Sequence, residues 1–144
     1  MNLWHLLRAA EVAWFYSARW PEIGPPYTQE RFDGIWACAS LLHVLPSAFP
    51  DVASRLANAL RPGGAWYLSF KLGVGVRTVA GRLFVDHTAE SLRTALSNLP
   101  LRMVETWTSE DARPGRGGEH WLNAVVLKRQ PNRGRCTWAC FGPV

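Results

Sequence analysis

The sequence has few lysines and no long apolar segment. Lys71 and Lys128 are the only two lysines among its sixteen basic residues. Its apolar runs stay below the roughly 18 residues that a membrane-spanning helix needs. The first 20 residues, MNLWHLLRAAEVAWFYSARW, carry charged residues within their apolar part and lack a small-residue cleavage site, which argues against a signal peptide. With both features absent, the default expectation is a soluble, cytoplasmic protein.

Cysteine is scarce as well, and the three residues present do not suggest a disulfide framework. Their number is odd, and Cys38 falls inside an apolar, strand-like run. Cys136 and Cys140 have the C-x3-C spacing, but no second pair completes a zinc site, and His120 would join them only by an accident of folding. We therefore expect no metal, and the role of Cys136 and Cys140 stays open.

The charge is basic, with 16 Lys and Arg against 11 Asp and Glu, a net charge of +5 and a pI near 9.6. Two explanations fit so much arginine: a GC-rich genome, or an anionic partner, because guanidinium groups suit phosphate. The arginines are scattered rather than aligned on one helix face, which favours the first explanation and ranks a nucleic-acid partner last. The 144 residues, 48% of them hydrophobic, suffice for one domain with a sizeable core.

Apolar periodicity and capping residues predict alternating helices and strands. Predicted helices cover 3–20, 47–60 and 89–98, and predicted strands cover 34–40, 65–70, 101–108 and 120–128. Thr88 caps the third helix, and the Pro- and Gly-punctuated segments 21–31 and 71–81 are expected to be loops. The alternation indicates a three-layer α/β sheet whose last two strands, joined without a helix, pair antiparallel.

In open α/β sheets, ligands bind beyond the carboxyl ends of the strands. This rule singles out CASLLH and KLGVG, which follow the first two predicted strands. His43 stands where a site residue would stand, although a turn also uses histidine as a polar end, and no acid at a fixed spacing orients it. GVGVRT begins like a dinucleotide-binding loop but has Thr78 in place of the third glycine, which favours a flexible loop. The spacing nominates neither a nucleophile elbow nor an acid–base pair.

The order of these pieces, over residues 32–129, resembles the carboxyl-terminal half of a class I S-adenosylmethionine-dependent methyltransferase. FDGIWACASLLHV is similar to that family's fourth strand and the loop after it, and LANALRPGGAWYLSFKLG is similar to its helix, L-x-P-G-G turn and fifth strand. DHTAESLRTALSNLPLRMVETWTSED and HWLNAVVLKR resemble the next helix, the sixth strand and the antiparallel seventh strand. The nearest likeness is to small bacterial methyltransferases of the tellurite-resistance type. The resemblance implies a Rossmann-like sheet with the seventh strand between the fifth and the sixth.

In this family, three strands precede the one that residues 34–40 resemble. A glycine-rich D-x-G-x-G loop after the first holds the methionine part of S-adenosylmethionine, and an acid at the end of the second holds the ribose. Residues 1–33 contain Gly24 as their one glycine, and D-x-G-x-G occurs nowhere in the sequence. By their position in the motif, the cofactor contacts that remain are Cys38, Ala39, Ser40 and Leu41, with His43 on the substrate side.

The resemblance implies an incomplete sheet and divides the chain into an aromatic helix and proline-rich loop (1–31), a methyltransferase-like half-domain (32–129) and a disordered tail (130–144). The 34–40 strand would then be a free apolar edge, to be covered by the tryptophan-rich N-terminal helix, a second copy of the chain or another protein.

We expect a truncated or degenerate methyltransferase that binds S-adenosylmethionine weakly and is inactive as an isolated chain. The alternative is a non-catalytic protein-binding or oligomerisation module. Evolutionary loss, a start-site error and a frameshift all stay open as causes of the missing half.

Overall fold

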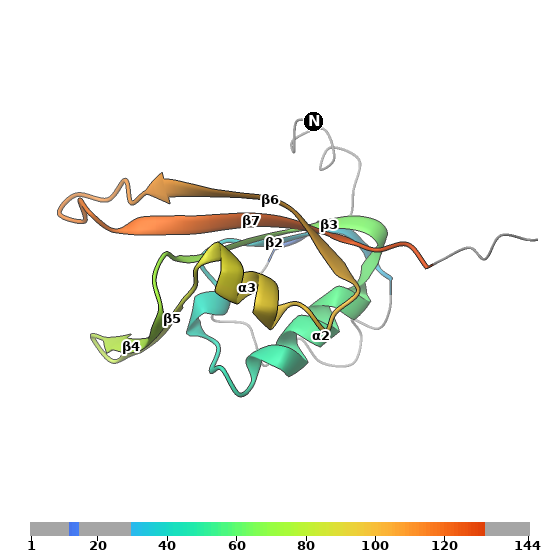
Figure 1. Ribbon diagram of the computed structural model, residues 1–144, viewed down its shortest axis with the longest axis horizontal. Helices are drawn as coiled ribbons and strands as arrows, with labels where there is room; N and C mark the ends of the chain where they lie inside the picture. Colours follow the sequence, from blue (N-terminus) through green and yellow to red (C-terminus); the bar gives the residue numbers. More distant parts are fainter. Residues whose placement is uncertain (1–11, 15–29, 132–144) are drawn as a thin grey trace, which may run out of the picture.

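A computed structural model of the chain describes residues 12–14 and 30–131 (Figure 1). In chain order the described elements are β1 (Val12–Trp14), β2 (Phe32–Ala37), the 3₁₀ helix η2 (Leu41–His43), α2 (Phe49–Ala59), β3 (Leu60–Lys71), β4 (Gly75–Val79), β5 (Arg82–Asp86), α3 (Ala89–Ala95), β6 (Leu101–Glu110) and β7 (His120–Lys128). Within this part of the chain, no helix is long and apolar enough to cross a membrane. The predicted tail lies outside the described residues from 132 onward.

Five strands form one sheet in the order β1-β2-β3-β7-β6. β1, β2 and β3 run parallel, whereas β7 is antiparallel to both β3 and β6. The predicted α/β class and the placement of the last strand between its two neighbours are therefore confirmed. The predicted three-layer arrangement is not found in the described residues, because α2 and α3 both pack on one face of the sheet. β4 and β5 form a separate two-stranded hairpin.

The core lies between the sheet and the helices α2 and α3, which cover the same face of it (Figure 1). Alternation along β3 decides which side chains enter this core, because successive side chains of a strand point to opposite faces. The core members on β3 and on the two helices include Trp66, Leu68, Phe70, Leu56 and Leu92. The residues between them on β3 point to the other face, and these are Tyr67, Ser69 and Lys71.

Both predicted helices in the described part exist, with shorter ends than predicted. α2 begins at Phe49 rather than at 47, and α3 ends at Ala95 rather than at 98. The predicted cap of α3 is confirmed: Thr88 Oγ1 accepts from the Ser91 N–H at 3.1 Å, and Ser91 Oγ accepts from the Thr88 N–H at 2.9 Å. This reciprocal capping box fixes where the helix begins.

The predicted strand boundaries shift at β2 and β3. β2 covers 32–37 rather than 34–40, and β3 begins at Leu60, directly after α2, rather than at 65. The segment RPGG, expected to end the helix as a turn, instead lies within β3 where its register with β2 shifts. At this shift, four residues of β3 (61–64) lie opposite one residue of β2, so the strand is irregular there, and Gly63 adopts a φ of +78°.

The loop predicted over 71–81 is wrong over Gly75–Val79, because these residues form β4, which pairs with β5. Ala80 and Gly81 connect the two strands, with φ angles of +49° and +75°. Positive φ at both central residues is typical of a type I′ hairpin turn, which most often contains Asn-Gly or Asp-Gly. Alanine gives no such signal, so the turn residues did not reveal the hairpin.

The helix predicted over 3–20 is wrong where the structure describes it. Val12–Trp14 form β1, which pairs in parallel with Gly34, Ile35 and Trp36 of β2. The rest of that prediction lies outside the described residues. Valine and tryptophan suit strands, and pairing with an open strand edge outweighs a weak local helix preference. The β2 edge, expected to be free, is therefore occupied at three residues by the chain itself.

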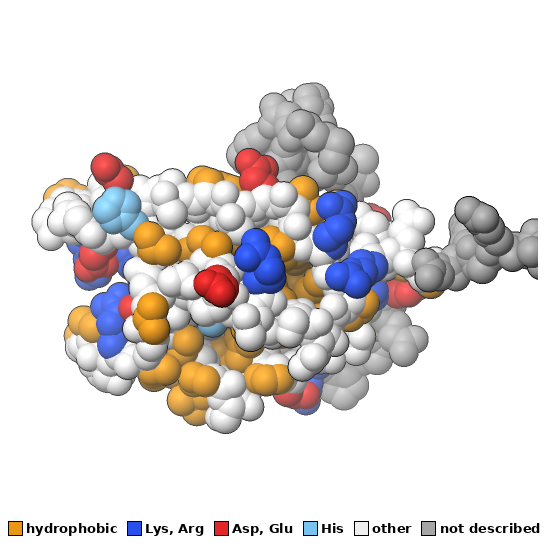
Figure 2. Space-filling view, viewed as in Figure 1, with side chains coloured by type: hydrophobic (Ala, Val, Ile, Leu, Met, Phe, Trp, Pro, Cys, Tyr) orange, Lys and Arg blue, Asp and Glu red, His pale blue; other side chains and the backbone are white. Residues whose placement is uncertain are grey.

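The surface seen in Figure 2 mixes charged and apolar side chains. Basic residues are interspersed with acidic and apolar ones on this face rather than gathered in one patch. The most exposed large apolar residues of the described part are on the loop after η2, around the β4–β5 hairpin and on β6, namely Leu45, Leu72, Val74, Val76, Val79, Val104 and Trp107.

Truncation of Leu68 tests the assignment of the core. Leu68 is fully buried at the centre of β3, so we expect Leu68→Ala to lower the free energy of unfolding by about 2–5 kcal/mol. Leu45→Ala is the matched control, because Leu45 is 56% exposed and should change stability by no more than about 0.5 kcal/mol. Urea denaturation followed by circular dichroism measures both. Equal losses in the two variants would contradict this core.

Candidate functional site

A cavity of about 360 Å³ lies at the carboxyl ends of β2 and β3. Three segments build its walls: the turn and η2 after β2, the β4–β5 hairpin, and the loop between β6 and β7 with the start of β7. Its lining residues are Ala39, Leu42, His43, Arg77, Val79, Ala80, Arg82, Phe84, Arg113, Arg116, Glu119 and Trp121. This is the edge of an open α/β sheet at which ligands bind.

The turn after β2 is held in a conformation that is unusual for its residues. Ala39 has a φ of +49°, in the left-handed region that glycine usually occupies. Its N–H donates to Ser69 Oγ on β3 at 2.8 Å, and Ser69 Oγ donates to Cys38 Sγ at 3.7 Å. The neighbouring strand therefore fixes the turn, and Ala39 is positioned in the cavity wall.

The four residues predicted to contact a cofactor have different surroundings. The Cys38 thiol is exposed, and Ala39 lines the cavity. Ser40 is 1% exposed, and its hydroxyl is buried with no hydrogen-bond partner among the described residues. Leu41 is buried and lines a second, apolar cavity of about 260 Å³ on the helix side of the sheet. The structure thus brings Ala39, and not Leu41, to the cavity at the strand ends.

His43, predicted on the substrate side, does line this cavity. Its Nδ1 lies 2.6 Å from the carbonyl oxygen of Leu83, and its Nε2 lies 3.2 Å from Nη2 of Arg82. Because a carbonyl only accepts, Nδ1 carries the donated proton and Nε2 accepts from the guanidinium. The ring also packs edge-on against Phe84, with 4.9 Å between centroids. The hairpin β4–β5 therefore orients the imidazole.

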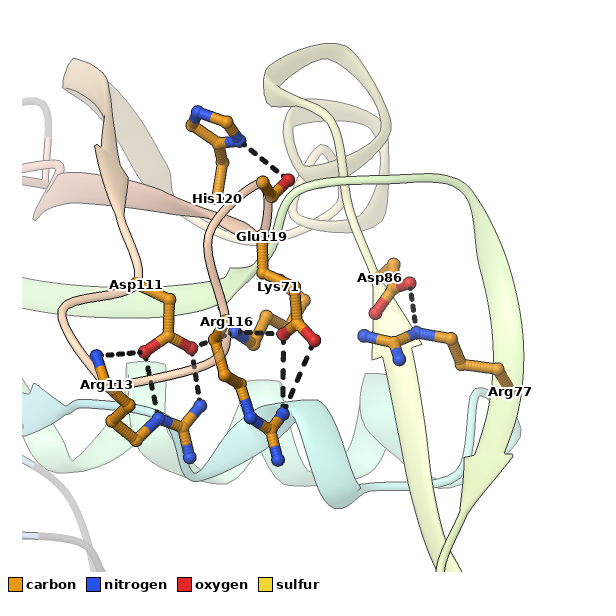
Figure 3. Close-up of polar contacts among 9 residues, drawn as sticks. Lys71, Arg77, Asp86, Asp111, Arg113, Arg116, Glu119 and His120 are labelled. Carbon is orange, nitrogen blue, oxygen red and sulfur yellow. Dashed lines mark hydrogen bonds and ion pairs between the residues drawn. The ribbon is translucent and has the colours of Figure 1, made fainter.

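A buried ammonium group joins β3 to the β6–β7 loop (Figure 3). Lys71, with a side chain 3% exposed, places Nζ 2.5 Å from Asp111 Oδ2 and 2.7 Å from Glu119 Oε2. The same Nζ lies 4.0 Å from the centre of the Trp121 ring. A lysine buried this deeply needs such partners, because an unpaired buried charge is costly.

The carboxylates of this cluster stay ionised. Arg113 binds Asp111 through Nε at 2.9 Å and Nη2 at 2.5 Å (Figure 3). Hydrogen bonds from Arg113 and then Lys71 hold the pKa of Asp111 well below its usual range. Lys71 is the main cause that lowers the pKa of Glu119, with a smaller contribution from Arg116. On the hairpin, Arg77 Nε pairs with Asp86 Oδ2 at 2.7 Å, which raises the pKa of Arg77.

Tyr67 lies on the same face of β3 as Ser69 and Lys71. Its hydroxyl donates to Asn123 Oδ1 at 2.7 Å, and its ring stacks on Trp36 with 4.0 Å between centroids. Burial, followed by the nearby Cys38, raises the pKa of Tyr67 to about 12. This hydroxyl is therefore a hydrogen-bond donor at neutral pH rather than a base.

Sequence reasoning missed most of this site. It singled out Ala39, His43 and the segment KLGVG that begins at Lys71, but gave no role to Lys71 and did not find the arginines of the hairpin and the β6–β7 loop. Only the placement of Lys71 at the end of an apolar strand gave a signal, because a lysine in a buried strand requires a distant acid. Within the described residues, no group of three or more His, Cys, Asp or Glu side chains is arranged to hold a metal ion.

The sequence matches no protein-family model and no curated protein. Several solved structures share its fold. A 1,6-didemethyltoxoflavin-N1-methyltransferase of Burkholderia thailandensis, crystallised with 1,6-didemethyltoxoflavin and S-adenosylhomocysteine, is 25% identical, with a TM-score of 0.61 over 71% of this chain and 46% of that one. A SAM-dependent methyltransferase of Methanosarcina mazei is 13% identical, with a TM-score of 0.62 over 76% of this chain and 65% of that one. The [4+2]-cyclase SpnF is 16% identical, with a TM-score of 0.57 over 76% of this chain and 55% of that one.

These likenesses show that the chain has the Rossmann-like fold of S-adenosylmethionine-dependent methyltransferases. The chain spans less than two thirds of the length of each of the three structures, at 46%, 65% and 55%. Since one of them is named as a cyclase, the fold by itself leaves the reaction open.

The Lys71 cluster predicts how stability responds to acid. Asp111 has a lowered pKa in the folded state, so its contribution is complete above its ordinary pKa near 4 and is lost as the pH falls further. We expect Asp111→Asn to reduce the free energy of unfolding at neutral pH and to flatten its decline below about pH 4. Urea midpoints measured across this pH range test it. Glu110→Gln, which removes the exposed acid next to Asp111, is the control. If the decline of Asp111→Asn is as steep as that of the unmodified chain, the assignment fails.

Proposed function

We propose that this chain is a methyltransferase-family protein whose described sheet supplies the strand-end edge for S-adenosylmethionine and a methyl acceptor. The observation that carries the proposal is the position of Ala39, which belongs both to the strand-end turn and to the cavity wall. In this reading the turn at Cys38–Leu41 faces the cofactor, and the cavity beside it takes the acceptor. The fold neighbours that bear methyltransferase names support it.

The residues present fit the cofactor in part. The exposed Cys38 and the cavity-facing Ala39 leave room at the end of β2, and they offer backbone groups and apolar contact. The backbone N–H of Ala39 is already bonded to Ser69, and the Ser40 hydroxyl is buried, so neither is free to bind a ligand. S-adenosylmethionine, when bound, would supply an electrophilic methyl group. His43 follows the turn and lines the cavity, and its Nε2 would serve as a proton acceptor only when Arg82 releases it.

The 144 residues alone should bind the cofactor weakly, because they contain no D-x-G-x-G loop. A hydrogen bond contributes about 1–1.5 kcal/mol, so four or five missing bonds remove about 5 kcal/mol. A tenfold change in affinity corresponds to about 1.4 kcal/mol, so a site of micromolar affinity would weaken to a dissociation constant of about 1 mM or more.

Titration of the ¹⁵N-labelled chain with S-adenosylhomocysteine and S-adenosylmethionine tests the proposal. We expect fast-exchange shifts at the amides of Cys38 and Ala39, with a dissociation constant of about 1 mM or weaker. Ser69→Ala removes the hydrogen bond that holds the Ala39 amide and should reduce these shifts. Ser54→Ala on α2 makes the same substitution away from the turn and should leave them unchanged.

Three outcomes would count against the proposal in different ways. Micromolar binding by calorimetry would refute the weak-binding argument and mean that other residues of the chain form a substitute site. Shifts confined to other strands would refute the role of the turn. Absence of binding up to the solubility limit of both compounds would favour the alternative, a non-catalytic protein-binding or oligomerisation module.

A further inference from the structure

We propose that the cavity at the carboxyl ends of β2 and β3 binds a small organic anion, a carboxylate or phosphate on an apolar body. Four arginines from two separate segments reach its wall: Arg77 and Arg82 from the hairpin, and Arg113 and Arg116 from the β6–β7 loop. Glu119 is the one acid among the lining residues. Guanidinium groups bind carboxylates and phosphates through paired hydrogen bonds, so this wall is suited to an anion.

The ion pairs around the cavity show which arginines are available to a ligand. Two of the four are engaged with an acid at short distance, because Arg77 pairs with Asp86 at 2.7 Å and Arg113 with Asp111 at 2.5 Å. Arg116 reaches Glu119 only at 3.4 Å and 3.5 Å, and that carboxylate is already 2.7 Å from Lys71.

Arg82 is the least compensated of the four. Within residues 30–131 it contacts no carboxylate, and its Nη2 lies 3.2 Å from Nε2 of His43. A guanidinium has five N–H donors, so an anion can bind Arg82 without displacing His43. Arg82 and Arg116 are therefore the two groups that would hold the anion.

Counting charges over the whole cluster leads to the same conclusion. Five basic side chains, Lys71, Arg77, Arg82, Arg113 and Arg116, face three carboxylates, Asp86, Asp111 and Glu119. The cluster therefore carries an excess of two positive charges, not counting His43. A carboxylate would neutralise one of them, and a phosphate dianion would neutralise both.

The rest of the wall indicates what the anion is attached to. Leu42, Val79, Phe84 and Trp121 form its apolar part. Cations already lie over both aromatic rings, with Arg77 5.1 Å from the centre of Phe84 and Lys71 4.0 Å from that of Trp121. A volume of about 360 Å³ is at the small end of ligand-binding cavities, so the body is about the size of one aromatic ring with substituents. Binding of the anion stands by itself, whereas its role as the methyl acceptor rests on the function proposed above.

The test uses the whole chain, labelled with ¹⁵N, and three probes that share a phenyl ring and differ in charge: phenyl phosphate, benzoate and neutral benzamide, the last two having nearly the same shape. No S-adenosyl compound is present in this titration. Failure of the anions to bind would therefore not contradict the cofactor proposal, and failure of the cofactor to bind would not contradict the anion proposal. We expect the two anions to shift the backbone amide resonances of His43, Arg82 and Arg116. Benzamide at the same concentrations should leave these resonances unshifted. Raising the ionic strength should weaken the binding of both anions, because salt screens partly exposed charges.

We expect Arg82→Gln and Arg116→Gln each to raise the dissociation constant of phenyl phosphate by about tenfold or more, because each substitution removes a charge-assisted hydrogen bond. Arg55→Gln is the matched control, because Arg55 is an exposed arginine on α2 that pairs with Asp51 at 3.0 Å. It makes the same change in net charge and should leave affinity unaltered. Equal binding of benzamide, an equal loss in Arg55→Gln, or absence of shifts for both anions would each overturn the proposal.

Discussion

The ammonium group of Lys71 is the point on which the arrangement of the site depends. It is buried at the end of β3, and its two carboxylate partners come from the loop that joins β6 to β7. A buried lysine without such partners would be strongly destabilising, so the loop must fold back over the strand end. That fold-back carries Arg113 and Arg116 to the cavity. The need to neutralise Lys71 therefore explains why the β6–β7 loop forms one wall of the cavity.

β3 connects the Lys71 ammonium group to the hydrophobic core, because successive side chains of a strand point to opposite faces of the sheet. Its core-facing residues, such as Leu68, pack against α2 and α3, and the residues between them point the other way. On that second side, Ser69 holds the Ala39 turn, and Lys71 holds the β6–β7 loop. One strand thus positions two walls of the cavity, and the packing of its apolar face fixes the register in which it does so.

The sequence predicted those elements whose local signals agree with their surroundings, such as β7 and the Thr88 cap. It failed at β1, where a short stretch pairs with a strand edge against its helical pattern, and at β4–β5, where Ala80 occupies a position usually held by Asn, Asp or Gly. The sheet order came from the family resemblance, since short links alone do not fix it. His43 and Ala39 were found because they follow a recognisable strand. The arginines were not, because the site joins residues about 40 positions apart and no fixed spacing marks them.

The arginines also bear on which reaction this edge of the sheet could serve. Methyltransferases and a cyclase share the fold, so the chemistry must be decided by side chains particular to this chain. Under the proposed function the cofactor would carry a sulfonium cation, and the two excess positive charges of the cluster would repel it. A carboxylate bound to Arg82 and Arg116 would reduce that repulsion and a phosphate dianion would offset it, so cofactor and anionic acceptor would each favour the binding of the other. A neutral or cationic acceptor would leave the repulsion in place. Under the proposed function, the electrostatics of this cavity would therefore favour an anionic methyl acceptor over a neutral or cationic one.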